Sequence, residues 1–258
     1  MTFSGARPRM LLDHEILAAR SIGRGNAAAK GNPLESCWER LALAPSPDQV
    51  RCVQPCEQSS ESDWEQGRRP FTIAMTLKGH LLVASPKLAD PNFNQSVVLI
   101  VQHTEAGALG LVLNRPTSTT LDQFWEKISP AALAPRKEPI YRGGPCKGPL
   151  MALHTAAEFS ETEIVSGVYF SADAESLEQL VSRRIMPVRF FIGCAGWGEQ
   201  QLEQELAANI WATLPASYAH VLAPSAENRW QKALRELTGR HMLEQIGIKG
   251  FPADSALN

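Results

Sequence analysis

The sequence contains no long hydrophobic run. Its longest apolar stretches, such as 97–101, have the length of a single strand. A membrane-spanning helix needs roughly 18 apolar residues or more. The first residues also contain no apolar segment followed by small residues, which is the pattern of a secretory signal. The sequence therefore predicts a soluble protein that is neither secreted nor inserted into a membrane.

Cysteine is scarce, and the spacing of the cysteines argues against a disulfide-stabilised scaffold and against a zinc finger. The five cysteines are an odd number without the spacing of a disulfide framework: Cys37, Cys52, Cys56, Cys146 and Cys194. Cys52 and Cys56 have three residues between them, and no second pair follows at zinc-finger spacing. We therefore expect a reducing, cytoplasmic location, no metal site and no cofactor.

The strings that mark common enzyme families are also missing. The sequence has no G-x-S-x-G, H-E-x-x-H, P-loop or G-x-G-x-x-G string. Cys194 is a candidate nucleophile, with His80, His103, His154 or His220 as its base. However, a small cysteine beside an apolar run is usually buried, and histidines that end strands usually make structural contacts. We predict a protein that is not an enzyme and keep a cysteine-dependent enzyme as an alternative.

A strongly basic segment is lacking as well. Lys and Arg number 25 against 27 Asp and Glu, and the resulting net charge of -2 belongs to residues 71–258. The clearest basic cluster is Arg183 and Arg184 with Arg189. DNA-binding domains usually show a basic face or a recognisable helix-turn-helix. Direct nucleic-acid binding is therefore not expected.

The apolar patterns typical of strands and helices begin only near residue 71. Residues 1–70 are rich in Gly, Pro, Ser and Ala and show no clear periodicity, which is typical of a poorly ordered extension. We predict a folded domain over 71–240 and a C-terminal tail over 241–258. Two interpretations of the extension stay open: a regulatory tail, or a misextended reading frame whose natural start is Met75.

The order of the predicted elements favours an α+β fold. A hairpin is predicted from two β-prone runs, 96–103 and 108–113, with a glycine-containing connection between them. Further strands are expected at 79–84, 140–142, 150–154, 168–170, 188–192 and 219–222. Four helices are expected. One covers 120–128, a second follows an N-cap at Asp173 or Ser171, and a third covers 202–214. The fourth begins after an N-cap at Ser225 and ends at a C-cap at Gly239. Helices interspersed among hairpins argue against a doubly wound parallel sheet.

A glycine turn at 193–198 separates a predicted strand from a predicted helix. Its glycines permit positive φ, and Trp197 supplies an apolar anchor; the glycines are Gly193, Gly196 and Gly198. Apolar residues then recur at every fourth position: Leu202, Leu206, Ile210 and Leu214. Acidic residues in the first turns complement the helix dipole and disfavour phosphate: Glu199, Glu203 and Glu205. We expect a structural hinge, with Gly196, Trp197 and Gly198 as its motif.

Five blocks of the sequence resemble, in order, those of the AlgH/YqgE family of bacterial proteins. They are residues 75–86, 90–93, 103–116, 141–145 and 194–206, and the similarity extends over about 75–240. The resemblance implies a compact α+β domain whose bifurcated, mostly antiparallel sheet curls into a pseudo-barrel with flanking helices. Members are often described as transcriptional regulators because of a genetic link to alginate control. The resemblance supplies no catalytic residues.

Polar and glycine residues at strand ends suggest a binding site. Asn114, Arg115 and Arg142 could together line a pocket for an anion or carboxylate, beside Gly143 and Gly144. The alternative is that these side chains only satisfy the carbonyl groups of their own turns. We predict a non-enzymatic binding or regulatory module with an unidentified protein or small-molecule partner. A direct DNA-binding regulator is the second interpretation.

Overall fold

The computed structural model describes residues 76–128, 136–223 and 228–245. The expectations for the extension at 1–70, for Met75 and for the Ser225 cap lie outside these residues. The domain boundaries therefore stay predictions. Cys37, Cys52 and Cys56 lie outside as well.

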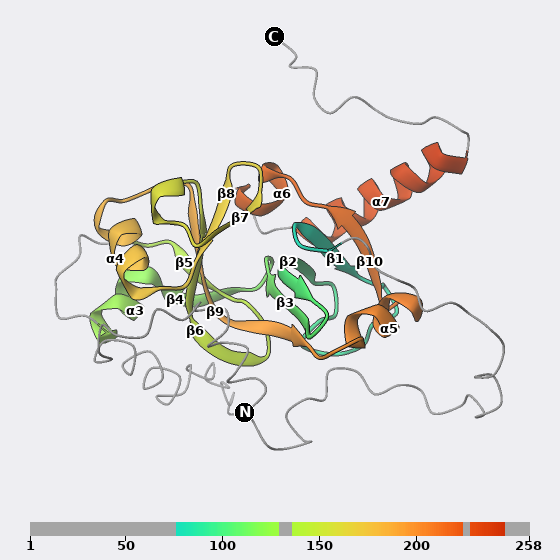
Figure 1. The fold of residues 1–258 in the computed structure, drawn as a ribbon, viewed down its shortest axis with the longest axis horizontal. Helices are drawn as coiled ribbons and strands as arrows, with labels where there is room; N and C mark the ends of the chain where they lie inside the picture. Colours follow the sequence, from blue (N-terminus) through green and yellow to red (C-terminus); the bar gives the residue numbers. More distant parts are fainter. Residues whose placement is uncertain (1–75, 129–135, 224–227, 246–258) are drawn as a thin grey trace, which may run out of the picture.

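Ten strands form the centre of the structure, and helices flank them (Figure 1). The strands are β1 (His80–Ala84), β2 (Val97–Thr104), β3 (Gly107–Val112), β4 (Pro116–Thr120), β5 (Pro139–Arg142), β6 (Cys146–His154), β7 (Thr162–Val165), β8 (Val168–Ser171), β9 (Val188–Trp197) and β10 (Trp211–Pro215). The helices are α3 (Leu121–Ile128), η2 (Ala157–Phe159), α4 (Ala174–Ser182), α5 (Gln201–Ala207), α6 (Tyr218–Leu222) and α7 (Arg229–Gln245).

The strands make one curled sheet in the order β10-β1-β2-β3-β9-β6-β8-β7, with β4 and β5 on a branch. All neighbouring pairs are antiparallel except β5 and β9, which run parallel. β9 extends from the half that contains β5 and β6 to the half that contains β3 (Figure 1). The predicted α+β class with a bifurcated, curled sheet is confirmed.

Side chains on both faces of the β2–β3 hairpin are buried, as the continuous apolar runs predict. Val97 and Leu99 of β2 join one core cluster, whereas Val98 and Ile100 join another. Alternate side chains of a strand point to opposite faces of its sheet. The sheet therefore has two apolar faces, and each must be covered.

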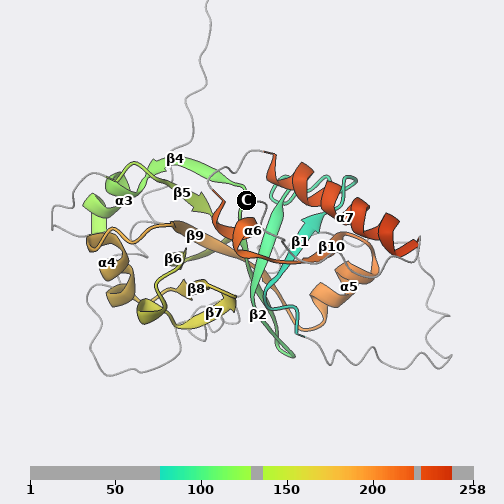
Figure 2. The ribbon, with the colours of Figure 1, turned by 90° about the horizontal axis from the view of Figure 1, so that it is seen from above.

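Helices provide part of this cover at the two ends of the sheet (Figure 2). α3 and α4 contribute Leu121, Phe124 and Leu180 to the cluster over β5, β6 and β9. The predicted cap of α4 is confirmed, because the Asp173 carboxylate accepts a hydrogen bond from the backbone N–H of Ser176 at 2.9 Å. At the other end, α5 and α7 lie beside β1 and β10 (Figure 2).

The glycine turn differs from its prediction. β9 continues through it to Trp197, because residues 195–197 pair with β3. Gly193 takes a positive φ of 71°, but the left-handed residue before α5 is Gln200, with a φ of 57°. The expected positive φ at Gly196 and Gly198 is therefore wrong. Gly193 is the bend that directs β9 from one half of the sheet to the other.

The side chain of Glu205 binds two tryptophan side chains near this segment. One of its carboxylate oxygens accepts hydrogen bonds from the indole N–H of Trp197 at 2.8 Å and of Trp211 at 2.7 Å. The other oxygen accepts from the Gln201 side chain at 2.9 Å. Glu205 is buried and lies after the first turn of α5, in which Glu203 is the acidic residue, so its expected role as a partner of the helix dipole is replaced by these side-chain contacts. A buried carboxylate is stable here because each oxygen has a donor.

Three further predictions in the C-terminal part are wrong. α5 ends at Ala207 instead of continuing to Leu214, and residues 211–215 become β10 because they pair with β1. Residues 218–222 form α6 instead of a strand, because Ser217 caps them. Gly239 does not end the last helix, since α7 continues to Gln245. The short strands β4 and β7 were not predicted.

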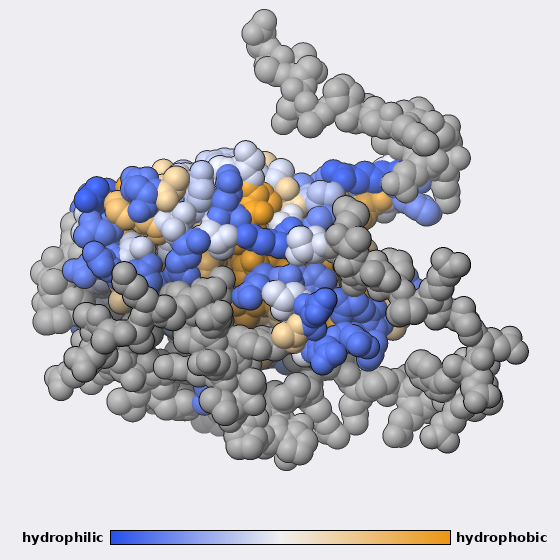
Figure 3. Space-filling model, viewed as in Figure 1, coloured by the Kyte–Doolittle hydropathy of each residue, from blue (hydrophilic) through white to orange (hydrophobic). Residues whose placement is uncertain are grey.

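Well-exposed hydrophobic side chains are few among the described residues. The face shown in Figure 3 is largely hydrophilic, with apolar residues in small areas only. Among the described residues, the large hydrophobic side chains that are well exposed are Met186 and Tyr218. None of the helices in the described ranges has the length and apolar character required to cross a membrane.

The Glu205 contacts make a stability prediction. Glu205→Ala leaves two buried indole N–H groups without an acceptor, and each unsatisfied donor costs about 1–3 kcal/mol. We expect the free energy of unfolding to fall by about 3–5 kcal/mol, measured by urea denaturation. Glu199→Ala removes an exposed carboxylate from the same segment and should change stability by less than about 0.5 kcal/mol. Equal stability of the two variants would contradict the assigned role of Glu205.

Candidate functional site

The two loops that the sequence singled out lie together in the structure. The backbone N–H of Arg142 donates to the carbonyl oxygen of Arg115 at 2.8 Å. One residue later, Gly143 donates to Ile192 at 2.8 Å and accepts from Val112 at 2.7 Å. The segment after β5 is therefore fixed between β3 and β9.

Glycine is required in this segment because two backbones meet directly. A Cβ atom at Gly143 would overlap the carbonyl oxygen of Gly193, and one at Gly144 would overlap the backbone of Cys194. We call Gly143, Gly144, Gly193 and Cys194 the glycine junction. Any side chain at Gly143 or Gly144 would force the two segments apart.

The predicted ligand-binding side chains face different surroundings. Asn114 binds the turn before β2, accepting from the N–H of Val97 at 3.0 Å and donating to the carbonyl of Gln95 at 2.8 Å. Arg115 donates to the backbone and the side-chain oxygen of Asn94, and partial burial lowers its pKa. Arg142 has an exposed side chain. Their role in ligand binding stays a prediction, and Arg142 is the member that faces solvent.

The junction also brings two cysteines together. Cys146 at the start of β6 lies opposite Cys194 of β9 in the antiparallel register, and both are thiols in the structure. Cys194 is fully buried, whereas Cys146 is partly exposed. A hydrogen bond from the Cys194 thiol lowers the pKa of Cys146 to about 7, against the opposing effect of burial, and a backbone contact to Gly196 adds to the lowering.

The sequence interpretation of Cys194 needs a correction, and it overlooked Cys146. Cys194 lies inside β9 and not between a strand and a helix, because β9 continues to Trp197. Cys146 follows the Gly-Gly-Pro turn, which placed it close to the predicted binding loop. Its position opposite Cys194 depends on the pairing of β6 with β9, which no local pattern reveals.

Two candidate histidines are held by structural contacts, as expected. His154 is fully buried; its Nδ1 accepts from the N–H of Ala156 at 3.2 Å, and its Nε2 lies 2.9 Å from the Ser171 hydroxyl. Burial lowers the pKa of His154 to about 4, so the ring is neutral near pH 7. His103 accepts from the N–H of Leu77 at 3.0 Å, and its Nε2 lies 2.8 Å from Glu203.

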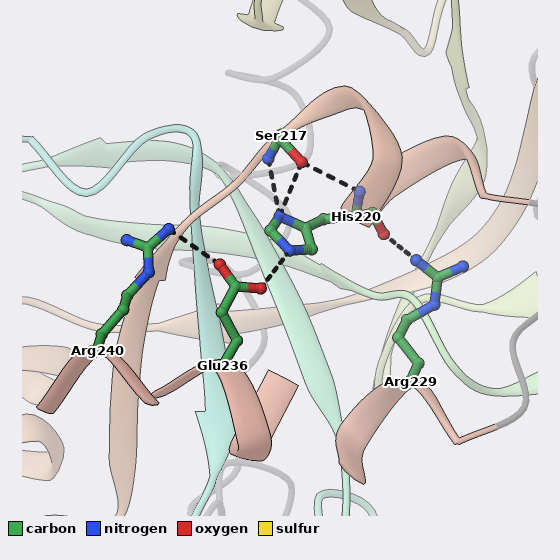
Figure 4. A network of polar contacts seen from close by, with 5 residues as sticks. All are labelled: Ser217, His220, Arg229, Glu236 and Arg240. Atoms are coloured by element: carbon green, nitrogen blue, oxygen red, sulfur yellow. Dashed lines mark hydrogen bonds and ion pairs between the residues drawn. The ribbon is translucent and has the colours of Figure 1, made fainter. Parts of the chain in front are cut away.

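The third histidine joins α6 to α7 (Figure 4). His220 Nε2 lies 2.9 Å from the Glu236 carboxylate, whose other oxygen accepts from Arg240 at 2.9 Å. The Ser217 hydroxyl lies 3.0 Å from His220 Nδ1, which gives a Ser-His-Glu sequence of contacts. This Nδ1 also accepts the backbone N–H of Ser217, and the hydroxyl accepts the N–H of His220. The group therefore forms a capping box for α6.

The predicted basic cluster does not form a single patch. Arg189 is buried, lies 4.9 Å above the Tyr141 ring and donates to the carbonyl oxygens of Leu113 and Ala223. Arg183 instead lies 5.0 Å above the ring of Phe159. Within the described parts of the chain, no three His, Cys, Asp or Glu side chains gather as they would around a metal ion.

Comparison with known proteins identifies the family. The family model described as AlgH-like matches residues 81–242, which is more than half of the sequence. The chain belongs to the AlgH-like family. The match contains most of β1, the glycine junction, both paired cysteines and most of α7.

Sequence relatives cover most of this chain, and a solved structure of this family agrees with its fold. A UPF0301 protein of Streptomyces avermitilis is 35% identical over 197 residues, covering 73% of this chain and 98% of that protein. One of Myxococcus xanthus is 37% identical and covers 60% and 87%. The solution structure of AlgH from Pseudomonas aeruginosa is 30% identical, covers 72% of this chain and all of that chain, and superimposes with a TM-score of 0.56.

The buried His154 makes a pH-dependence prediction. In the unfolded chain its pKa is near 6.5, whereas the folded pKa is about 4, so only the unfolded state binds the proton between these values. Stability should therefore fall as the pH drops from 6.5 to 4, by about 3 kcal/mol from this residue. His154→Asn keeps an acceptor for Ala156, and its free energy of unfolding should depend less steeply on pH in this window.

Urea denaturation across this pH window measures the effect. His220→Asn is the control, because His220 lies on the partly exposed contact between α6 and α7. The free energy of unfolding of this variant should still fall steeply between pH 6.5 and 4, because His154 is unchanged. Identical pH profiles for wild type and His154→Asn would contradict the assignment of a neutral, buried His154.

Proposed function

We propose that this AlgH-like protein is a non-enzymatic binding or regulatory module that acts through a ligand or protein partner. The proposed contact surface is the pair of segments 114–116 and 142–145. The observation that supports it most is the exposed guanidinium of Arg142, which stands at the end of β5 on a segment fixed by backbone contacts.

The chemistry of this surface suits an anionic group. Arg142 and Lys147 are both exposed and lie on either side of the Gly-Gly-Pro-Cys segment. A guanidinium can donate two parallel hydrogen bonds to a carboxylate or phosphate. Asn114 and Arg115 support the surface indirectly, because they hold the turn before β2 and because Arg115 accepts the N–H of Arg142. We therefore propose a carboxylate or phosphate as the recognised group.

Two alternatives are less well supported. A direct DNA-binding regulator would use a basic face, but residues 71–258 carry a net charge of -2 and Arg189 is buried. A cysteine-dependent enzyme would use a histidine beside its thiol, but His103, His154 and His220 contact Glu203, Ser171 and Glu236. The fourth candidate, His80, lies in β1, which pairs with β2 and β10 and not with the strands of Cys146 and Cys194. A cytoplasmic location is part of the proposal and fits Cys146 and Cys194, which are both thiols.

Thermal unfolding in the presence of a set of carboxylate and phosphate metabolites tests the binding proposal. A ligand present at about 100 times its Kd stabilises the protein by about 2.7 kcal/mol, which corresponds to a Tm rise of about 5–10 °C. We expect at least one such compound to raise the Tm of the full chain and Arg142→Ala to lose most of that rise.

Arg235→Ala is the matched control, because it removes an exposed arginine on α7 and should keep the full Tm rise. An Arg142→Ala variant that keeps the rise would contradict the assigned surface. Fluorescence anisotropy of the full chain with duplex DNA tests the regulator alternative. Tight binding that weakens steeply with salt would replace the present proposal with direct DNA recognition.

A further inference from the structure

The opposed cysteines of β6 and β9 have the spacing of a disulfide. Directly opposite residues of antiparallel strands have Cα atoms about 4.5–5.5 Å apart. Disulfides in proteins join Cα atoms about 4.4–6.8 Å apart. Because Cys146 and Cys194 are register partners, they can be joined without moving either strand far.

Gly148 lies close to the buried sulfur of the pair. A Cβ placed at Gly148 would lie 3.8 Å from the Cys194 Sγ, an ordinary van der Waals distance, so no side chain of this residue stands against the sulfur. The β6–β9 register is also irregular between Cys146 and Leu150. The first residues of β6 are therefore less constrained by the ladder than the rest of the strand.

The two thiols differ in access. Cys146 is partly exposed and meets a dissolved reagent first, whereas Cys194 is fully buried behind it. The hydrogen bond from Cys194 favours the thiolate of Cys146, whose pKa is about 7. The thiolate is the nucleophile in thiol–disulfide exchange, and thiols with a pKa near the ambient pH exchange fastest.

We propose that Cys146 and Cys194 form a reversible dithiol–disulfide pair that is oxidised by low-molecular-weight disulfides, with Cys146 as the attacking thiol and Cys194 as the resolving thiol. The Cys146 thiolate attacks one sulfur of the small disulfide, which forms a mixed disulfide and releases one thiolate. Cys194 then loses its proton and attacks the Cys146 sulfur, which releases the second thiolate. Two protein thiols are oxidised and one small disulfide is reduced to two thiols.

This inference does not rest on the proposed ligand site, but it has a consequence for it. The new bond would connect β6 to β9 at the glycine junction, where Gly144 touches the backbone of Cys194. Arg142 lies two residues before Gly144. A disulfide here would therefore tie the segment that carries the exposed arginine more firmly to β9.

Peptide mapping of the oxidised full chain tests the proposal. The chain is incubated with oxidised glutathione at pH 7, the remaining thiols are alkylated, and the protein is digested with trypsin without reduction. Cleavage after Arg142, Lys147, Arg189 and Arg229 places the two cysteines in peptides 143–147 and 190–229. We expect these two peptides to be recovered as one disulfide-linked species, which dithiothreitol separates. Oxidised protein without this species would overturn the proposal.

Single variants separate the two roles. Cys194→Ala should stop at a mixed disulfide between glutathione and Cys146, and Cys146→Ser should leave Cys194 unmodified while the protein is folded. Cys37, Cys52 and Cys56 lie in other peptides and serve as internal references. Cys146 that reacts no faster than these references would contradict its role as attacking thiol.

The pH dependence of alkylation is a second measurement that does not depend on disulfide formation. The rate of iodoacetamide reaction at Cys146 should be half-maximal near pH 7 in the wild type. Cys194→Ala removes the hydrogen bond to the thiolate, so the midpoint should move up by about one pH unit or more. Unchanged midpoints in a variant with wild-type Tm would show that Cys194 does not activate Cys146.

Discussion

The direct contact between two backbones at the glycine junction is the constraint on which the structure depends. β9 pairs with β6 and β5 along its first part and with β3 along its last part, so it belongs to both halves of the sheet. The positive φ of Gly193 redirects the strand between these partners. Gly143 and Gly144 then fit against it because they have no side chains. Gly143 and Gly144 are therefore required for the topology and also shape the candidate site.

Buried polar side chains also stabilise β9 near both of its ends. Glu205 accepts from Trp197 and thereby fixes the end of β9 to α5 and β10. Arg189 near its start donates to the carbonyl oxygen of Leu113. Similar contacts hold His103, His154 and Glu205, which the sequence also singled out. The exposed Arg142 and the paired thiols of Cys146 and Cys194 differ from them in this respect.

The sequence predicted most elements whose signal is local. The β2–β3 hairpin, the cap of α4 and the mixed element order follow from apolar runs, turn residues and a capping aspartate. Residues 208–214 were predicted wrongly because apolar residues at every fourth position also fit a short helix followed by a strand, and only the pairing of β10 with β1 decides between them. The buried role of Glu205 and the Cys146–Cys194 pair were missed for a similar reason. Both depend on contacts between segments distant in the sequence, which local patterns do not contain.

The most direct test of this account compares two glycine substitutions by urea denaturation. Gly144→Ala places a methyl group into the backbone of Cys194, whereas Gly239→Ala adds one to an open position within α7. Alanine in a helix interior is favoured over glycine by about 0.5–1 kcal/mol. We predict that Gly144→Ala loses several kcal/mol of stability, on the order of 3 or more, and that Gly239→Ala is at least as stable as the wild type. A Gly144→Ala protein with wild-type stability would contradict the central role of the glycine junction.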